Sequence, residues 1–221
     1  RVVENWPKPL PDTRHSHKGW TWGSFGGVYA ESPDRIWIAM RGELPLPENA
    51  APWTPYAALN PTRGTATGNG DGISATCEPT EKRGWERRYE HSIFVVDGEG
   101  NLVDEWPHLD PLFAKLSCGR GPHQIKISPY DPQKHVWIID DQLHVIYKFT
   151  YDGKLVFTHG ELGVRGRGPN TFDRPTDIAW LPDGTYFISD GYGGKRVAKF
   201  APDGKFIMDW GQAPKDPKNP G

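Results

Sequence analysis

The chain has little cysteine, no long apolar run and no excess of charge of either sign. Only Cys77 and Cys118 occur in 221 residues, so at most one internal disulfide is available; that bond and two buried thiols both fit the sequence. No apolar stretch approaches the roughly 18 residues that span a bilayer. The 26 Lys and Arg balance 28 Asp and Glu, which gives no support to a basic surface for nucleic acid or anionic lipid. We therefore expect no nucleic acid and no membrane among the partners.

Turn-forming and aromatic residues are abundant instead. The chain holds 26 Gly, 22 Pro, 10 Trp and 8 Tyr, a composition that favours many short strands joined by tight turns. It begins with Arg1 and carries no signal peptide there, which we interpret as the mark of a chain processed or trimmed at its start.

Two segments of the chain, 122–160 and 175–211, align almost without adjustment. Each segment predicts four strands, and the two segments are spaced about 50 residues apart. Four-stranded units repeated at this spacing are typical of β-propeller blades. The outer turns are Asp152-Gly153 and Asp203-Gly204, and an Asp-Gly pair tolerates the positive φ of two-residue hairpins. The predicted strands are 123–128, 135–139, 144–149 and 154–158, then 176–181, 185–189, 195–200 and 205–210.

A third copy is interrupted by a long insertion. Residues 25–40 supply its two inner strands and residues 91–106 its two outer ones, with residues 43–90 inserted between them. The sequence thus predicts an all-β, NHL-type propeller with about three four-stranded antiparallel blades. Since propellers close with four to eight blades, we expect a ring completed by the rest of a parent chain or by association. The predicted segments are an N-terminal segment 1–24, blade one 25–106, blade two 107–160, blade three 161–211 and an inter-blade loop 212–221.

Five short motifs stand at fixed places in these blades. Val28 precedes Arg41-Gly42 by thirteen residues, and blade two opens with Pro122-His123-Gln124-Ile125 and carries Leu143-His144 further out. Blade three carries Pro175-Thr176-Asp177-Ile178 and Ser189-Asp190-Gly191-Tyr192. Over about residues 26–211 this pattern resembles the peptidyl-α-hydroxyglycine α-amidating lyase family, whose members are six-bladed NHL-like propellers.

The resemblance assigns a role to five residues. It implies that His123 is a zinc ligand, that the carbonyls of Val28 and Ile125 bind a structural calcium, that Arg41 serves the substrate and that Tyr192 is the catalytic base. Simpler interpretations stay open for three of them. His123 could be hydrogen-bonded to the backbone at the start of a strand, Arg41 could be a surface arginine, and Tyr192 could be an aromatic side chain that covers a turn.

The chain also departs from the family pattern. Gln124 replaces a glycine, and Gly193 stands where a cysteine often follows the tyrosine. The resemblance places the other two zinc histidines, a second arginine and the calcium-binding aspartate in blades outside this chain. One histidine does not make a catalytic zinc site, which takes three protein ligands plus water.

Other polar residues have simpler interpretations. Asp140, Asp141 and Asp190 begin outer hairpins, where we expect them to cap turns. His15 and His17 lie in a polar terminal segment, where solvation is the expected state and metal binding the minor alternative.

The resemblance implies a secreted or periplasmic, metal-dependent lyase. Its substrate would be a small peptide or an acyl-glycine derivative, split at a carbinolamide C–N bond into an amide and glyoxylate. The main alternative is a non-catalytic NHL propeller that binds a protein or peptide on its rim through residues 43–90. An RNA-binding NHL domain is disfavoured by the even charge.

Overall fold

The computed structural model describes residues 6–22, 25–45, 88–114 and 121–211. The chain divides into two compact units, residues 1–121 (unit 1) and 122–221 (unit 2). Cys77, Cys118, the inter-blade loop 212–221 and most of the predicted insertion lie outside the described residues. Of the described residues, none belongs to a helix with the length and hydrophobicity of a membrane span.

Unit 1 contains one four-stranded antiparallel sheet in the order β2-β3-β5-β6. The predicted inner and outer hairpins of blade one are both present, although the insertion separates them in sequence. The strands are β2 (Phe25–Ser32), β3 (Arg35–Met40), β5 (Ile93–Val96) and β6 (Leu102–Glu105). A two-stranded sheet pairs β1 (Trp20–Thr21) with β4 (Leu44–Pro45), and the short helices η2 (Pro107–Leu109) and α1 (Asp110–Phe113) follow β6.

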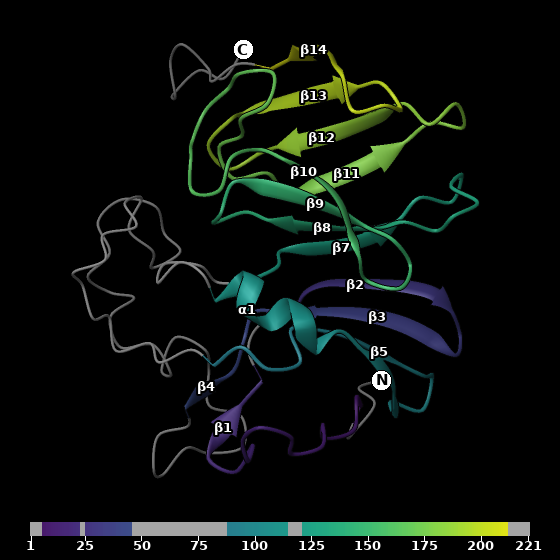
Figure 1. The fold of residues 1–221 in the computed structure, drawn as a ribbon, viewed down its shortest axis with the longest axis vertical. Helices are drawn as coiled ribbons and strands as arrows, with labels where there is room; N and C mark the ends of the chain where they lie inside the picture. The colour runs from purple at the N-terminus through teal and green to yellow at the C-terminus, as the bar shows by residue number, and fades with distance from the viewer. Residues whose placement is uncertain (1–5, 23–24, 46–87, 115–120, 212–221) are drawn as a thin grey trace, which may run out of the picture. The chain divides into compact units, whose positions relative to one another are not determined.

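Unit 2 contains two four-stranded antiparallel sheets, β7 to β10 and β11 to β14, each with its strands in sequence order (Figure 1). Their bounds differ from the predicted ones by about one residue. The first sheet has β7 (Gln124–Ile127), β8 (Val136–Asp140), β9 (Val145–Phe149) and β10 (Leu155–His159). The second has β11 (Asp177–Trp180), β12 (Tyr186–Asp190), β13 (Arg196–Phe200) and β14 (Phe206–Trp210).

The turns form where the sequence predicts them. Gly153 and Gly204 adopt φ values of +83° and +89°, the left-handed conformation that glycine reaches without a steric penalty. The main-chain N–H of each donates to the carbonyl three residues earlier, that of Thr150 and that of Ala201. The Asp-Gly pairs therefore close the outer hairpins of both repeats.

The two sheets of unit 2 pack against each other through one apolar cluster. The first sheet contributes Trp137 and Ile146, and the second contributes Ile188 and Phe200, all at most 3% exposed. β9 is buried at four of its five positions, where a half-exposed strand would alternate. The predicted all-β fold of four-stranded antiparallel blades is confirmed, while closure into a six-bladed ring stays a prediction.

Candidate active site

The structure brings His123 and Tyr192 together from two different blades of unit 2. Nε2 of His123 lies 3.2 Å from the Tyr192 hydroxyl, within hydrogen-bond distance, although 69 residues separate the two. Their ring centroids are 5.6 Å apart at an interplanar angle of 71°. His123 directly precedes β7, and Tyr192 lies in the turn after β12. The pair therefore joins two motifs that lie in different repeats of the sequence.

Tyr192 owes its place to a tightly bonded turn. The N–H groups of Gly193 and Gly194 both donate to the Asp173 carbonyl, at 2.9 Å each. The Asp190 carboxylate accepts the Asp173 N–H at 2.8 Å, which ties Asp173 to the start of this turn, while its role as a cap of its own hairpin stays a prediction. Burial raises the pKa of Asp190, and this effect outweighs the opposing hydrogen bond and ion pair that the carboxylate makes with Arg196.

Arg174 covers the ring of Tyr192. Its guanidinium carbon lies 4.5 Å from the ring centroid, within the range of a cation–π contact. Nη2 of the same guanidinium lies 3.0 Å from the carboxylate of Asp141, whose side chain is fully buried. Sequence analysis missed Arg174 and predicted Asp141 only as a turn cap, so this pairing enlarges the candidate site.

His144 contacts the backbone of Arg174. Its Nδ1 accepts the main-chain N–H of Arg174 at 3.1 Å, so the ring proton of the neutral imidazole sits on Nε2. Burial, reinforced by the positive charge of Arg165, lowers the pKa of His144 to about 4. His144 is therefore neutral near pH 7 and available as an acceptor.

The other predicted site residues are distributed over both units. Ile125 lies fully buried in β7 of unit 2, close in sequence to His123. Val28, in β2 of unit 1, is 53% exposed and pairs with Ile38, and Arg41 follows β3 with a largely buried side chain. The roles that the resemblance gives these residues stay predictions.

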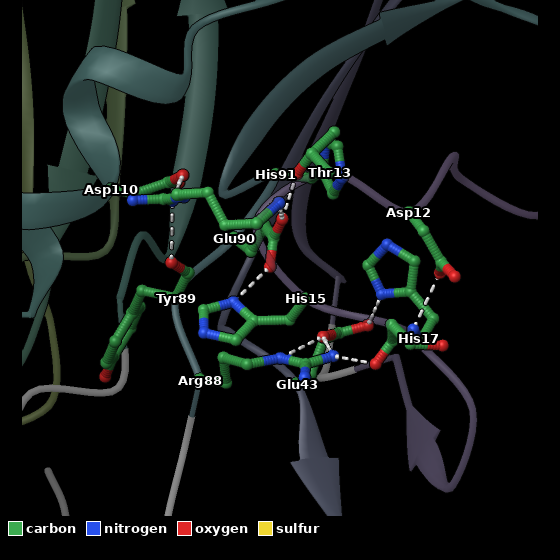
Figure 2. A network of polar contacts seen from close by, with 12 residues as sticks. Asp12, Thr13, His15, His17, Glu43, Arg88, Tyr89, Glu90, His91 and Asp110 are labelled. Atoms are coloured by element: carbon green, nitrogen blue, oxygen red, sulfur yellow. Dashed lines mark hydrogen bonds and ion pairs between the residues drawn. The ribbon is translucent and has the colours of Figure 1, made fainter.

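A second polar cluster ties the N-terminal segment to blade one of unit 1 (Figure 2). Glu43 and Arg88 exchange two main-chain hydrogen bonds of 2.8 and 3.0 Å across the base of the insertion. The Glu43 carboxylate also accepts from Arg88 at 2.5 Å and lies 2.6 Å from Nδ1 of His17. His17 thus contacts a buried carboxylate in this cluster and is not simply solvated.

Glu90 anchors the neighbouring part of the N-terminal segment. Its buried carboxylate accepts from the Thr13 hydroxyl and from the Arg14 N–H at 2.9 Å, and lies 2.8 Å from Nδ1 of His15. Burial by itself would raise the pKa of Glu90, but these hydrogen bonds lower it to about 2. These contacts hold residues 13–15 of the N-terminal segment against Glu90.

No metal site is complete within the described parts of the chain. None of their His, Cys, Asp and Glu side chains form a group of three or more that could hold an ion. The described residues therefore supply His123 as one candidate ligand and do not by themselves fit a zinc ion, which needs three.

The sheets define a protein built of propeller-type blades, and comparison with known proteins adds a family likeness. The chain is similar to peptidyl-α-hydroxyglycine α-amidating lyase 1 of Drosophila melanogaster, with 36% identity over 113 residues, 47% of this chain and 20% of the fly protein. It is 38% identical to peptidyl-glycine α-amidating monooxygenase of Mus musculus over 144 residues, 58% of this chain and 14% of the mouse protein. The predicted resemblance to amidating lyases is confirmed.

The chain matches a fifth or less of the length of these two curated relatives. No protein-family model matches it. Virginiamycin B lyase from Staphylococcus aureus, a solved structure, has 14% identity and a TM-score of 0.40, covering 86% of this chain and 56% of its own.

Proposed function

We propose that the protein is a lyase that cleaves the carbinolamide C–N bond of an N-acyl-α-hydroxyglycine, giving an amide and glyoxylate. The observation that carries the proposal is the 3.2 Å contact between His123 Nε2 and the Tyr192 hydroxyl. The similarity to amidating lyases supports it, because both residues stand in motifs that resemble that family.

Tyr192 has the chemistry that the reaction requires. Cleavage breaks the hydroxyl O–H and the C–N bond, forms the aldehyde C=O and leaves the nitrogen in need of a proton. An ionised tyrosine can take the proton from the hydroxyl oxygen and return it to the nitrogen, so that all atoms balance. Tyr192 is 54% exposed, so solvent and a substrate can reach this residue.

His123 and Arg41 take supporting roles in this proposal. We propose His123 as one ligand of a zinc ion whose other ligands lie outside the described residues. Zinc, when bound, supplies Lewis acidity. The Arg41 guanidinium suits the substrate carboxylate, since its donors form a bidentate fork. The carbonyls of Val28 and Ile125 stay candidates for a structural calcium, and a secreted or periplasmic location stays part of the proposal.

The test is product formation from N-benzoyl-α-hydroxyglycine by the full-length protein. We expect glyoxylate and benzamide in equal amounts, and a loss of about 10²- to 10⁴-fold in kcat for Tyr192→Phe, the usual range for removal of a general base. Tyr130→Phe is the matched control, because Tyr130 is similarly exposed at 49% and no contact joins it to His123 among those described.

The outcomes separate the two classes of function. Equal kcat values for the wild type and Tyr192→Phe would remove Tyr192 from the reaction. A wild-type protein that releases no glyoxylate, with or without added zinc, would contradict the lyase and favour the non-catalytic binding propeller.

A further inference from the structure

The position of Arg174 beside Tyr192 carries a further inference. We infer that Arg174 is a positioning residue, which orients the Tyr192 hydroxyl toward His123 through the stack Asp141–Arg174–Tyr192. The inference rests on the proposed lyase function and deepens it. It adds a residue to which the resemblance gives no role.

The first argument is the contact itself. The Arg174 guanidinium carbon lies 4.5 Å from the centroid of the Tyr192 ring, on the same tyrosine whose hydroxyl reaches His123 Nε2 at 3.2 Å. A planar guanidinium lying over an aromatic face restrains the ring, since stacking and cation–π attraction both favour that geometry. At 54% exposure, Tyr192 is less confined by packing than a buried tyrosine.

The second argument is that the guanidinium is itself fixed. Nη2 of Arg174 lies 3.0 Å from Oδ2 of Asp141, with side-chain exposures of 10% and 0%. The same Oδ2 accepts the Gln142 side-chain amide at 3.0 Å, which holds the carboxylate in place. Because breaking a buried ion pair leaves an uncompensated charge, the guanidinium keeps this orientation.

The third argument is the backbone of Arg174. Its φ is +66°, a left-handed conformation that is uncommon for a residue with a side chain. The hydrogen bond from its N–H to His144 Nδ1, at 3.1 Å, maintains that conformation. Strained backbone of this kind concentrates at functional sites, where the surrounding structure maintains it.

These contacts point to an action through Tyr192. The Arg174 guanidinium already contacts the buried Asp141 carboxylate and the Tyr192 ring. Asp141 balances its charge, so orientation of the ring, and not added positive charge, is what the stack supplies. A misplacement of about 1 Å at a reacting group costs up to about 10²-fold in rate.

The experiment compares variants of the full-length protein. Arg174→Met removes the guanidinium and keeps an unbranched stem, and Arg174→Met/Asp141→Asn also removes the charge that the single variant leaves buried. With N-benzoyl-α-hydroxyglycine we expect both variants to lose roughly 10- to 100-fold in kcat, with KM changed by less than about twofold. Arg167→Met is the matched control, because the exposed Arg167 guanidinium donates to the Gly211 carbonyl at 3.1 Å and no contact among those described joins it to Tyr192.

A second readout does not depend on activity. We would place 3-fluorotyrosine at position 192 and record its ¹⁹F resonance in the wild type and in the three variants. We expect a shifted or broadened resonance in both Arg174 variants and an unchanged one in Arg167→Met. A wild type without lyase activity would overturn the proposed function alone, because this readout still tests the positioning role.

Two results would overturn the inference. One is an unmoved fluorotyrosine resonance in folded Arg174→Met/Asp141→Asn. The other is a variant that loses thermal stability but keeps the wild-type kcat per folded molecule, since that is the behaviour of a residue with a purely structural role.

Discussion

Arg174 and Gly121 occupy the same backbone position in successive repeats. Each directly precedes the proline that opens a blade, and their φ values are +66° and +86°. Glycine adopts this conformation without strain, whereas an L-residue with a side chain pays roughly 1–2 kcal/mol. An arginine where the neighbouring repeat has glycine therefore indicates a role for its side chain, which in this structure covers Tyr192.

Gly193→Ala should disturb the turn that carries Tyr192. A Cβ on Gly193 would lie 2.3 Å from the Asp173 carboxylate, which must then move and strain its contact with Arg165. We expect a loss of about 1–3 kcal/mol in the free energy of unfolding, the usual cost of overpacking, and a marked fall in kcat. Urea unfolding and the glyoxylate assay measure the two effects.

Gly191→Ala is the control for that variant, on the other side of Tyr192. Its Cβ would meet Thr176 Oγ1 at 3.2 Å, a closeness that a small shift of the threonine relieves. Equal damage from the two substitutions would contradict the assignment of the Asp173 contact as the determinant of the turn.

Acid should destabilise the protein through two buried histidines. Burial lowers the pKa of His144 and of His159 to about 4, from an ordinary value of 6.5. The unfolded chain therefore binds more protons than the folded one between pH 6.5 and 4, and stability falls as the pH drops through this window. The expected slope is up to about 1.4 kcal/mol per pH unit for each histidine.

His159→Gln isolates one of these contributions. The substitution removes a titrating ring whose Nε2 contacts the buried Tyr186 hydroxyl. Urea unfolding at several pH values between 7 and 4 should show a shallower pH dependence in this variant, and an unaltered one in His108→Gln, where the ring is exposed. A pH dependence that His159→Gln leaves unchanged would show that this ring does not titrate as its burial predicts.

Glu90→Ala should release the N-terminal segment from blade one. The Glu90 carboxylate accepts the Arg14 N–H and the Thr13 hydroxyl, and the loss of a buried acceptor costs about 1–3 kcal/mol. Hydrogen exchange should then show faster exchange of the Arg14 amide, while Glu99→Ala, in an exposed turn, leaves it unchanged.

The lowered pKa of Glu90 predicts that its hold on the N-terminal segment weakens in acid. Its pKa is lowered from 4.5 to about 2, so its stabilising effect is complete above pH 4.5 and is lost as the pH falls toward 2. Faster exchange at Arg14 should therefore appear in the wild type over that interval, once intrinsic exchange rates are accounted for. Its absence would indicate that other contacts hold the segment.

The blades could be predicted from sequence because local patterns determine them. Alternating apolar residues and the Asp152-Gly153 and Asp203-Gly204 turns fix strands and hairpins over a few residues each. The two motifs of His123 and Tyr192 were recognisable separately, but their contact spans 69 residues and emerges only when two sheets pack.

Arg174 could not be predicted in the same way. Its ion pair joins it to Asp141, 33 residues away, and no local pattern encodes that distance. The one available signal was the repeat alignment, which places Arg174 opposite Gly121. The polar contacts of His15 and His17 were missed for the same reason, since Glu90 lies 75 residues from His15 and Glu43 lies 26 residues from His17.

The most direct test of the account is whether His123 and Tyr192 act as one site. It uses a double-mutant cycle on kcat with N-benzoyl-α-hydroxyglycine: wild type, His123→Ala, Tyr192→Phe and the combined variant. Residues that act as a unit are strongly non-additive, so we predict that the combined variant is about as slow as the slower single one. Losses that multiply, or a wild type with no activity to lose, would contradict a shared His123–Tyr192 active site.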